Sequence, residues 1–191
     1  MTKIILFGDS ITAGYSKGKV TDQLTRRIKV SFPAADVVNA GIPGETTREA
    51  LLRVSRDVLE YTPDVVTLFF GANDVAENRH LSLADYEANL KQLISLIGPK
   101  RTVLVTGPYT NQQEQGKQRP LSRIEAYVES ALRIGKDSLC TTVPLYEMMQ
   151  RSGRPDEWLQ SDGLHFFEAG YTQLAALMTE AIRKTMKGRE R

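Results

Sequence analysis

The chain has 191 residues, of which 41% are hydrophobic and 25% charged, and a formal net charge of +2. This composition is typical of a globular protein, and the length predicts one domain spanning residues 1–191. The basic residues are too dispersed along the chain to form a nucleic-acid-binding surface. No apolar run is as long as a membrane span, which needs about 20 residues. The apolar run Ile4 to Phe7 is too short for a signal peptide, so we expect a cytoplasmic protein.

Short apolar runs alternate with amphipathic segments along the chain, a pattern typical of strand and helix units around a parallel sheet. The pattern predicts five strands, which are Lys3 to Phe7, Asp36 to Asn39, Val65 to Phe70, Thr102 to Thr106 and Ser138 to Thr142. The third and fourth are nearly all apolar, as expected for strands covered on both faces. The single cysteine, Cys140, lies in the last run and is expected to be a buried small hydrophobe.

Apolar residues at helical spacing predict five helices between and after these strands. They are Val20 to Phe32, a segment from Thr46 through Val58, Ser82 to Ile97, Leu121 to Ile134 and Phe167 to Met186. Thr46 and Glu49 have the spacing of a capping box, and Gly98-Pro99 is a strong stop signal. The polar segment Asn111 to Arg119 is expected to be a mobile surface loop.

Right-handed crossovers would fold this chain into a three-layer α/β/α sandwich with a five-stranded parallel sheet. The flavodoxin-like strand order 2-1-3-4-5 makes the first and third strands neighbours whose connections leave in opposite directions. The crevice at their carboxyl ends is the expected ligand site.

The most distinctive polar residues follow these two strands. Ser10, in Gly8-Asp9-Ser10, comes directly after the first strand, where it could be either a nucleophile or part of a helix cap. Asn73 follows the third strand, where its amide could stabilise an oxyanion near Ser10 or simply form a turn.

Two further segments could complete a site. Asp162 stands three residues before His165, close enough to accept the imidazole Nδ1 proton and leave Nε2 as a base. The only other histidine, His80, lies in a polar segment and is expected to be exposed to solvent. In the turn after the second strand, either Gly41 or Gly44 could offer a backbone N–H to an oxyanion.

Together, Gly8-Asp9-Ser10, the Gly44 turn, Gly71-x-Asn73-Asp74 and Asp162-x-x-His165 resemble the ordered motifs of the SGNH hydrolases, also called the GDSL esterase family. The resemblance spans almost the whole chain, although Ile11 stands where the family name has Leu. It implies that Ser10 is the nucleophile, His165 the base and Asp162 its partner. It also implies an oxyanion hole formed by the N–H groups of Ser10 and Gly44 and by the Asn73 side chain.

The resemblance implies a serine esterase that acts on a small-molecule ester without a metal or other cofactor. The acyl substrate, small or medium in size, could be a carboxylic ester, a thioester or an O-acetyl group. Apolar residues flank the expected site and would form its rim, namely Ile42, Pro43, Val75, Tyr109 and Phe166. Two alternatives remain open, a catalytically silent module that binds acylated sugars or lipids, and a flavodoxin-like binder of nucleotides or phosphate.

Overall fold

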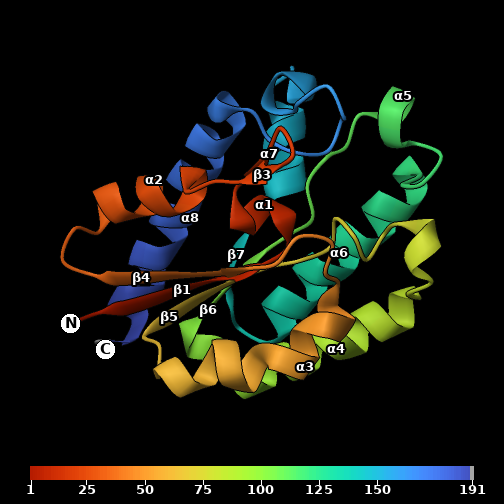
Figure 1. Cartoon of the computed structure of the whole chain (residues 1–191). Coiled ribbons are helices and arrows are strands. Elements are labelled where there is room, and N and C mark those ends of the chain that lie inside the picture. The colour runs from red at the N-terminus through yellow and green to blue at the C-terminus, as the bar shows by residue number, and fades with distance from the viewer. Residues whose placement is uncertain (190–191) are drawn as a thin grey trace.

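A computed structural model describes residues 1–189 and shows one five-stranded parallel sheet. Its strands are β1 (Lys3–Gly8), β4 (Asp36–Gly41), β5 (Val65–Phe69), β6 (Thr102–Val105) and β7 (Thr141–Val143). They lie in the order β4-β1-β5-β6-β7, and every neighbouring pair is parallel. This confirms the predicted order 2-1-3-4-5 and the α/β/α sandwich (Figure 1).

Helices cover both faces of the sheet (Figure 1). One layer holds α2 (Gln23–Ser31) and α8 (Glu168–Arg189), and the other holds α3 (Thr47–Asp57), α4 (Leu83–Ile97) and α6 (Leu121–Asp137). Because successive strand residues point to opposite faces, Ile4 and Leu6 of β1 pack toward α8, whereas Ile5 and Phe7 pack toward α3 and α4. The core therefore forms two clusters, one on each side of the sheet.

The capping box and the helix stop that the sequence predicts are both present in the structure. The Thr46 hydroxyl accepts the Arg48 N–H, and the Glu49 carboxylate accepts the Thr46 N–H at 2.8 Å, which forms the predicted capping box of α3. The helix α4 ends before Gly98, whose φ of 97° suits glycine. No helix within residues 1–189 is long and apolar enough to cross a membrane.

The first predicted helix begins three residues later than expected. Val20, its predicted first residue, instead belongs to a small antiparallel hairpin of β2 (Tyr15–Ser16) and β3 (Lys19–Val20). Lys17 and Gly18 at the turn both have positive φ, as a two-residue hairpin turn of this hand requires. The prediction failed because strands of two residues carry no readable alternation.

The fifth strand was predicted too early in the chain. The helix α6 continues to Asp137, and Leu139 follows in a left-handed conformation with its side chain exposed, so β7 begins only at Thr141. Cys140 is half-buried against the core rather than fully buried, and burial raises the pKa of its thiol to about 11.

The expected mobile loop, Asn111 to Arg119, contains the short helix α5 (Gln112–Gln115) and is fastened to its surroundings. The Asn111 N–H donates to the Gly163 carbonyl at 2.9 Å, and the Gln118 carbonyl accepts the Glu77 N–H at 2.9 Å. The segment is therefore partly helical and hydrogen-bonded to the protein where an irregular surface loop was expected, and its mobility stays a prediction. The helix α7 (Leu145–Arg151) was not predicted at all.

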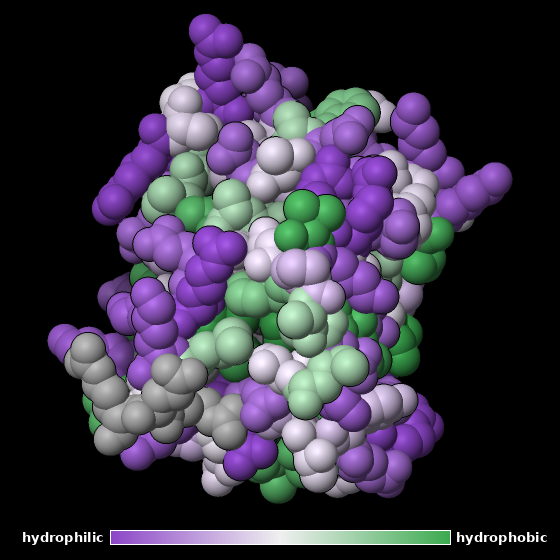
Figure 2. All heavy atoms as spheres, turned by 90° about the vertical axis from the view of Figure 1, so that its left-hand side faces the viewer, coloured by the Kyte–Doolittle hydropathy of each residue, from purple (hydrophilic) through white to green (hydrophobic). Residues whose placement is uncertain are grey.

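A groove of about 1220 Å³ runs between α2 and α8. Basic side chains line it, among them Arg26, Arg183 and Lys187, and Ala175 and Ala176 contribute apolar surface. Figure 2 shows this side of the molecule, where hydrophilic side chains border smaller hydrophobic areas. None of the predicted site residues lines this groove.

Candidate active site

The structure brings the predicted hydroxyl, imidazole and carboxylate together at the carboxyl end of the sheet. Ser10 is the first residue of α1 (Ser10–Ala13), which directly follows β1. The Ser10 Oγ lies 3.0 Å from the His165 Nε2, and the His165 Nδ1 lies 2.6 Å from the Asp162 Oδ2. A hydroxyl, an imidazole and a carboxylate in series can activate the hydroxyl as a nucleophile.

Local backbone geometry fixes the position of Ser10. The Asp9 side chain caps α1 by accepting the Ile11 N–H at 2.9 Å. Gly8 leaves room for the sharp turn, because a Cβ there would lie 2.1 Å from the Thr12 Oγ1 and 2.5 Å from the Phe69 carbonyl oxygen. The Ser10 side chain is consequently held on a rigid turn rather than on a flexible loop.

The carboxylate of Asp162 organises the loop that carries the imidazole. Its Oδ1 accepts the backbone N–H groups of Leu164 at 3.0 Å and His165 at 2.9 Å, while Oδ2 faces the ring. Burial alone would raise the pKa of Asp162, but these hydrogen bonds and the one to the His165 ring hold it below its usual value. Asp162 is therefore ionised when it faces the imidazole at neutral pH.

Three hydrogen-bond donors follow the carboxyl ends of β1, β4 and β5. In the part of the chain that the structure describes, the N–H groups of Ser10 and Gly44 have no hydrogen-bond partner. The Asn73 Nδ2 donates one of its two hydrogens to the Glu45 carbonyl at 3.0 Å, which leaves the second available. These are the groups that the sequence motifs select as oxyanion donors.

The geometry distinguishes the two glycines that the sequence left open. The Gly41 N–H already donates to the Asn39 Oδ1 at 2.9 Å, and its Cα packs against Ala13. Gly44 has a φ of 83°, and the space where a Cβ would stand is open. Gly44 therefore has the free donor, and Gly41 has a packing role.

Two buried carboxyl groups, Asp9 and Asp74, lie beneath this site. Asp74 accepts from the Thr47 N–H at 2.8 Å, the Thr47 hydroxyl at 2.6 Å and the Gly71 N–H at 3.0 Å, which ties α3 to the end of β5. Burial raises the pKa of Asp74 to about 6 despite these hydrogen bonds. Burial likewise raises the pKa of Asp9 to about 7.

The predicted rim residues separate into two groups. Ile42 and Pro43 are exposed beside Gly44, and Tyr109 is half-buried. The side chains of Val75 and Phe166 are buried in the two core clusters, which contradicts their expected place on the rim. Their apolar character reflects core packing, a role that the sequence could not separate from substrate contact.

Sequence reasoning missed several residues that surround the site. Arg119 Nε donates to the Ala72 carbonyl at 2.7 Å, and Gln115 Nε2 donates to the Asp162 carbonyl at 2.7 Å. The Tyr15 ring packs on the His165 ring. His80 is exposed as expected, but its neighbour Arg79 donates to the Gly44 carbonyl at 2.5 Å. No local motif marks these residues, because each acts through a contact distant in the sequence.

Comparison with known proteins gives consistent matches. The GDSL-like Lipase/Acylhydrolase family matches residues 6–173. The isoamyl acetate-hydrolyzing esterase 1 homolog of Bos taurus is 31% identical over an alignment of 196 positions, gaps included, that covers 88% of this chain and 76% of that protein.

Solved structures show the same relationship. A lipase/acylhydrolase from Enterococcus faecalis superposes with a TM-score of 0.93 at 39% identity and 96% coverage of each chain. An acetylxylan esterase from Geobacillus stearothermophilus superposes with a TM-score of 0.78 at 25% identity, covering 95% of this chain and 94% of that one. Because the family match runs from β1 into α8, the chain belongs to the GDSL-like lipase/acylhydrolase family and is a carboxylic ester hydrolase.

Proposed function

We propose that this chain hydrolyses esters of small or medium acyl groups through a triad of Ser10, His165 and Asp162. The observation that carries the proposal is the continuous series of contacts from the Ser10 Oγ to the His165 Nε2, 3.0 Å, and from the His165 Nδ1 to the Asp162 Oδ2, 2.6 Å. Such a series places the base within reach of the proton that it must remove.

The proposed reaction has two steps. His165 takes the Ser10 hydroxyl proton as the oxygen attacks the ester carbonyl, and it returns that proton to the leaving alcohol when the carbon–oxygen bond breaks. Water then attacks the acyl-enzyme with His165 again as base, and the acid and free Ser10 are released. The negative charge on Asp162 orients the imidazole and stabilises its protonated form.

The oxyanion of each tetrahedral intermediate would bind the N–H groups of Ser10 and Gly44 and the Asn73 amide. Support comes from the unpartnered state of both backbone groups among residues 1–189 and from the spare Asn73 hydrogen. Donors fixed before the reaction are effective because no reorganisation is needed as charge develops.

For the substrate, we propose short acyl esters, with acetyl esters first. Two relatives bear the names isoamyl acetate-hydrolyzing esterase and acetylxylan esterase, and both names denote acetyl esters. The exposed Ile42 and Pro43 beside Gly44 offer a small apolar surface to the acyl or alcohol group. Thioesters and acetylated sugars remain within the same chemistry and belong in the same assay.

The test combines labelling with a substrate panel. A fluorophosphonate probe is expected to label the wild-type protein at Ser10, and p-nitrophenyl acetate is expected to be cleaved faster than the longer esters. Ser10→Ala should abolish labelling and lower kcat by on the order of a million-fold. A Ser10→Ala protein with most of its esterase activity would overturn the triad, and an unlabelled wild-type protein would favour the silent binding module.

A further inference from the structure

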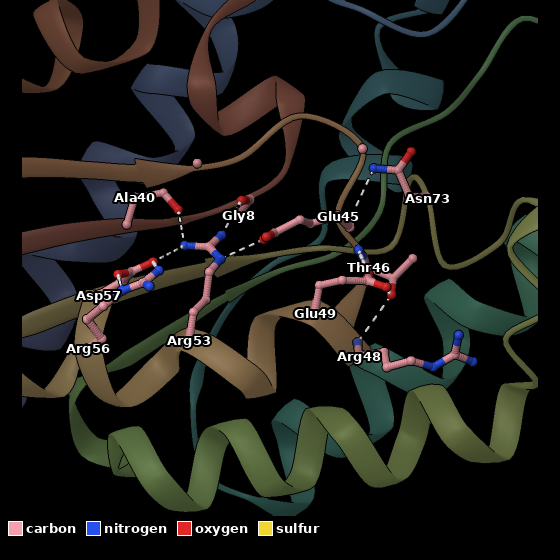
Figure 3. Close-up of polar contacts among 12 residues, drawn as sticks. Gly8, Ala40, Glu45, Thr46, Arg48, Glu49, Arg53, Arg56, Asp57 and Asn73 are labelled. Carbon is pink, nitrogen blue, oxygen red and sulfur yellow. Dashed lines mark hydrogen bonds and ion pairs between the residues drawn. The ribbon is translucent and has the colours of Figure 1, made fainter.

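The guanidinium of Arg53 lies buried beneath the candidate site. It projects from α3 toward the carboxyl ends of β1 and β4, and only 6% of its side chain is exposed (Figure 3). Its Nη2 donates to the Gly8 carbonyl at 3.2 Å, and its Nη1 donates to the Ala40 carbonyl at 2.9 Å. One side chain therefore joins the strand ends from which the Ser10 turn and the Gly44 turn begin.

The same guanidinium also holds the turn itself. Arg53 Nε donates to the Glu45 carboxylate at 2.6 Å, and the Glu45 carbonyl accepts from the Asn73 Nδ2 at 3.0 Å (Figure 3). Glu45 directly follows Gly44 in the chain. Glu45 thus connects Arg53 to the other two proposed oxyanion donors. It is bonded to Gly44 through the chain, and its carbonyl holds the Asn73 side chain.

Stability alone does not require this arrangement. Burying a cation is costly unless it is paired, and the Asp57 carboxylate on the same helix already pairs with Arg53 Nη1 at 3.1 Å. The guanidinium also stacks on the Phe7 ring, 4.5 Å from its centroid. The contact to Glu45 adds a hydrogen bond between α3 and the β4–α3 turn, which carries Gly44.

We propose that Arg53 is a positioning residue that fixes the oxyanion donors of Ser10, Gly44 and Asn73 relative to one another through its bonds to Gly8 and Glu45. The inference rests on the proposed function of the site. The planar fork of a guanidinium suits this task, because it can hold several acceptors at once in fixed directions. A displacement of about 1 Å in such a site lowers the rate strongly.

The test compares two partners of the same guanidinium. Substituting Arg53 itself would leave several buried acceptors unpaired, so its carboxylate partners are truncated instead. Glu45→Ala removes the partner in the β4–α3 turn. Asp57→Ala, the matched control, removes the partner at the C-terminal end of α3. The side chains of Glu45 and Asp57 are similarly exposed, 15% and 20%, so both truncations should lower the thermal unfolding midpoint to a similar extent.

The kinetic readout separates positioning from stability. We expect Glu45→Ala to lower kcat roughly 10- to 100-fold with little change in KM, because loss of a whole oxyanion donor costs about 100- to 1000-fold. Asp57→Ala should leave both constants within about threefold of wild type. Glu45→Gln, which still accepts from Arg53, should restore most of the lost kcat. Equal losses of kcat in Glu45→Ala and Asp57→Ala would overturn the inference.

A double-mutant cycle with Asn73 asks whether the effect passes through the oxyanion donors. In an Asn73→Ala background, the Glu45→Ala substitution should lower kcat much less than it does in the wild-type protein, because one of its targets is already gone. Full additivity would overturn the inference. Ser10→Ala separates failure of the proposed function from failure of this inference. An active Ser10→Ala protein would overturn the triad. An inactive Ser10→Ala protein together with a fully active Glu45→Ala protein would overturn only the role of Arg53.

Discussion

The Tyr15 ring packs against the imidazole of His165, with the ring centroids 4.6 Å apart and the planes inclined by 48°. Tyr15 belongs to the β2–β3 hairpin, which is fastened at two points. The Tyr171 hydroxyl shares its hydrogen between the Ile11 carbonyl at 3.1 Å and the Tyr15 carbonyl at 3.3 Å, and the Lys17 N–H donates to the Gln160 side chain at 3.2 Å. The hairpin therefore holds one face of the imidazole in place.

Removal of this ring should impair catalysis without changing any residue of the proposed triad. We expect Tyr15→Ala to lower kcat roughly tenfold, because the imidazole gains freedom to rotate away from Ser10. Tyr15→Phe keeps the ring and should remain close to wild type. The measurement is steady-state hydrolysis of p-nitrophenyl acetate, and a Tyr15→Ala protein as active as Tyr15→Phe would show that the ring contact is incidental.

Sequence reasoning predicted the sheet order and the residues that follow each strand, because long apolar runs and motifs at strand ends are local signals. It placed Ser10 and Asn73 at the carboxyl ends of neighbouring strands for the same reason, whereas His165 was added through its spacing to Asp162 and the resemblance to a family. The hairpin at Tyr15 and the helix α7 were not predicted, because two-residue strands and a seven-residue helix show too little periodicity. The single-domain organisation and the cytoplasmic location stay predictions.

The residues that surround the motifs could not be predicted from local patterns. Arg53 bonds to Gly8, 45 positions earlier, and Arg119 bonds to Ala72, 47 positions earlier. Either arginine could equally be a solvated surface residue in the sequence, and only the tertiary fold shows that both side chains turn inward. Ser10 and His165 could be predicted although they lie 155 positions apart, because each stands in a recognisable local motif. Neither arginine stands in such a motif.

The two glycines of the β4–α3 turn should respond differently to alanine. In Gly41→Ala the new Cβ would lie 2.3 Å from the Ala13 backbone nitrogen, so we expect a loss of about 1–3 kcal/mol in the free energy of unfolding. In Gly44→Ala the Cβ meets nothing within 4 Å, and only the positive φ of 83° is unfavourable, at about 1–2 kcal/mol.

The kinetic effects of these substitutions identify the oxyanion donor. Relaxation of Gly44→Ala away from its positive φ would turn the free N–H out of the site, so kcat should fall while the protein remains folded. Urea titration and ester hydrolysis of both variants make the comparison. If Gly44→Ala keeps full kcat, its N–H is not an oxyanion donor that depends on this conformation.

The buried carboxyl group of Asp9 should make stability depend on pH. Burial raises the pKa of Asp9 to about 7, the hydrogen bond from Ile11 opposes this, and the nearby Asp74 adds to it. Between the unfolded value of 3.8 and about 7, the folded protein binds a proton that the unfolded chain lacks. This contribution to stability is complete below pH 4 and is lost as the pH rises toward 7.

Asp9→Asn removes this dependence while keeping an acceptor for the Ile11 N–H. The free energy of unfolding of the variant relative to wild type should therefore rise between pH 5 and pH 8, by roughly 2 kcal/mol. Denaturant titrations at the two pH values measure it, and Asp22→Asn at an exposed position is the control. A difference that is the same at both pH values would contradict a buried, protonated Asp9.

Arg119 should keep the 111–119 segment ordered against the site. Its Nε bonds to the buried Ala72 carbonyl, and its Nη1 donates to the Gln115 Oε1 at 2.5 Å, while Gln115 in turn reaches the Asp162 carbonyl. One arginine thereby links the loop that carries Asp162 and His165 to the segment that carries Asn73. Arg119→Ala breaks this link and leaves the Ala72 carbonyl without its side-chain donor.

We expect Arg119→Ala to increase amide hydrogen exchange across residues 111–119 and to lower kcat for p-nitrophenyl acetate, since Asn73 and the Asp162 loop lose a shared support. Lys117→Ala, at an exposed position of the same segment, should change neither quantity. If exchange rises but kcat does not, the segment is ordered by Arg119 without serving the site. If neither changes, the remaining bonds at Asn111 and Gln118 suffice to hold the segment, and Arg119 is dispensable for both order and catalysis.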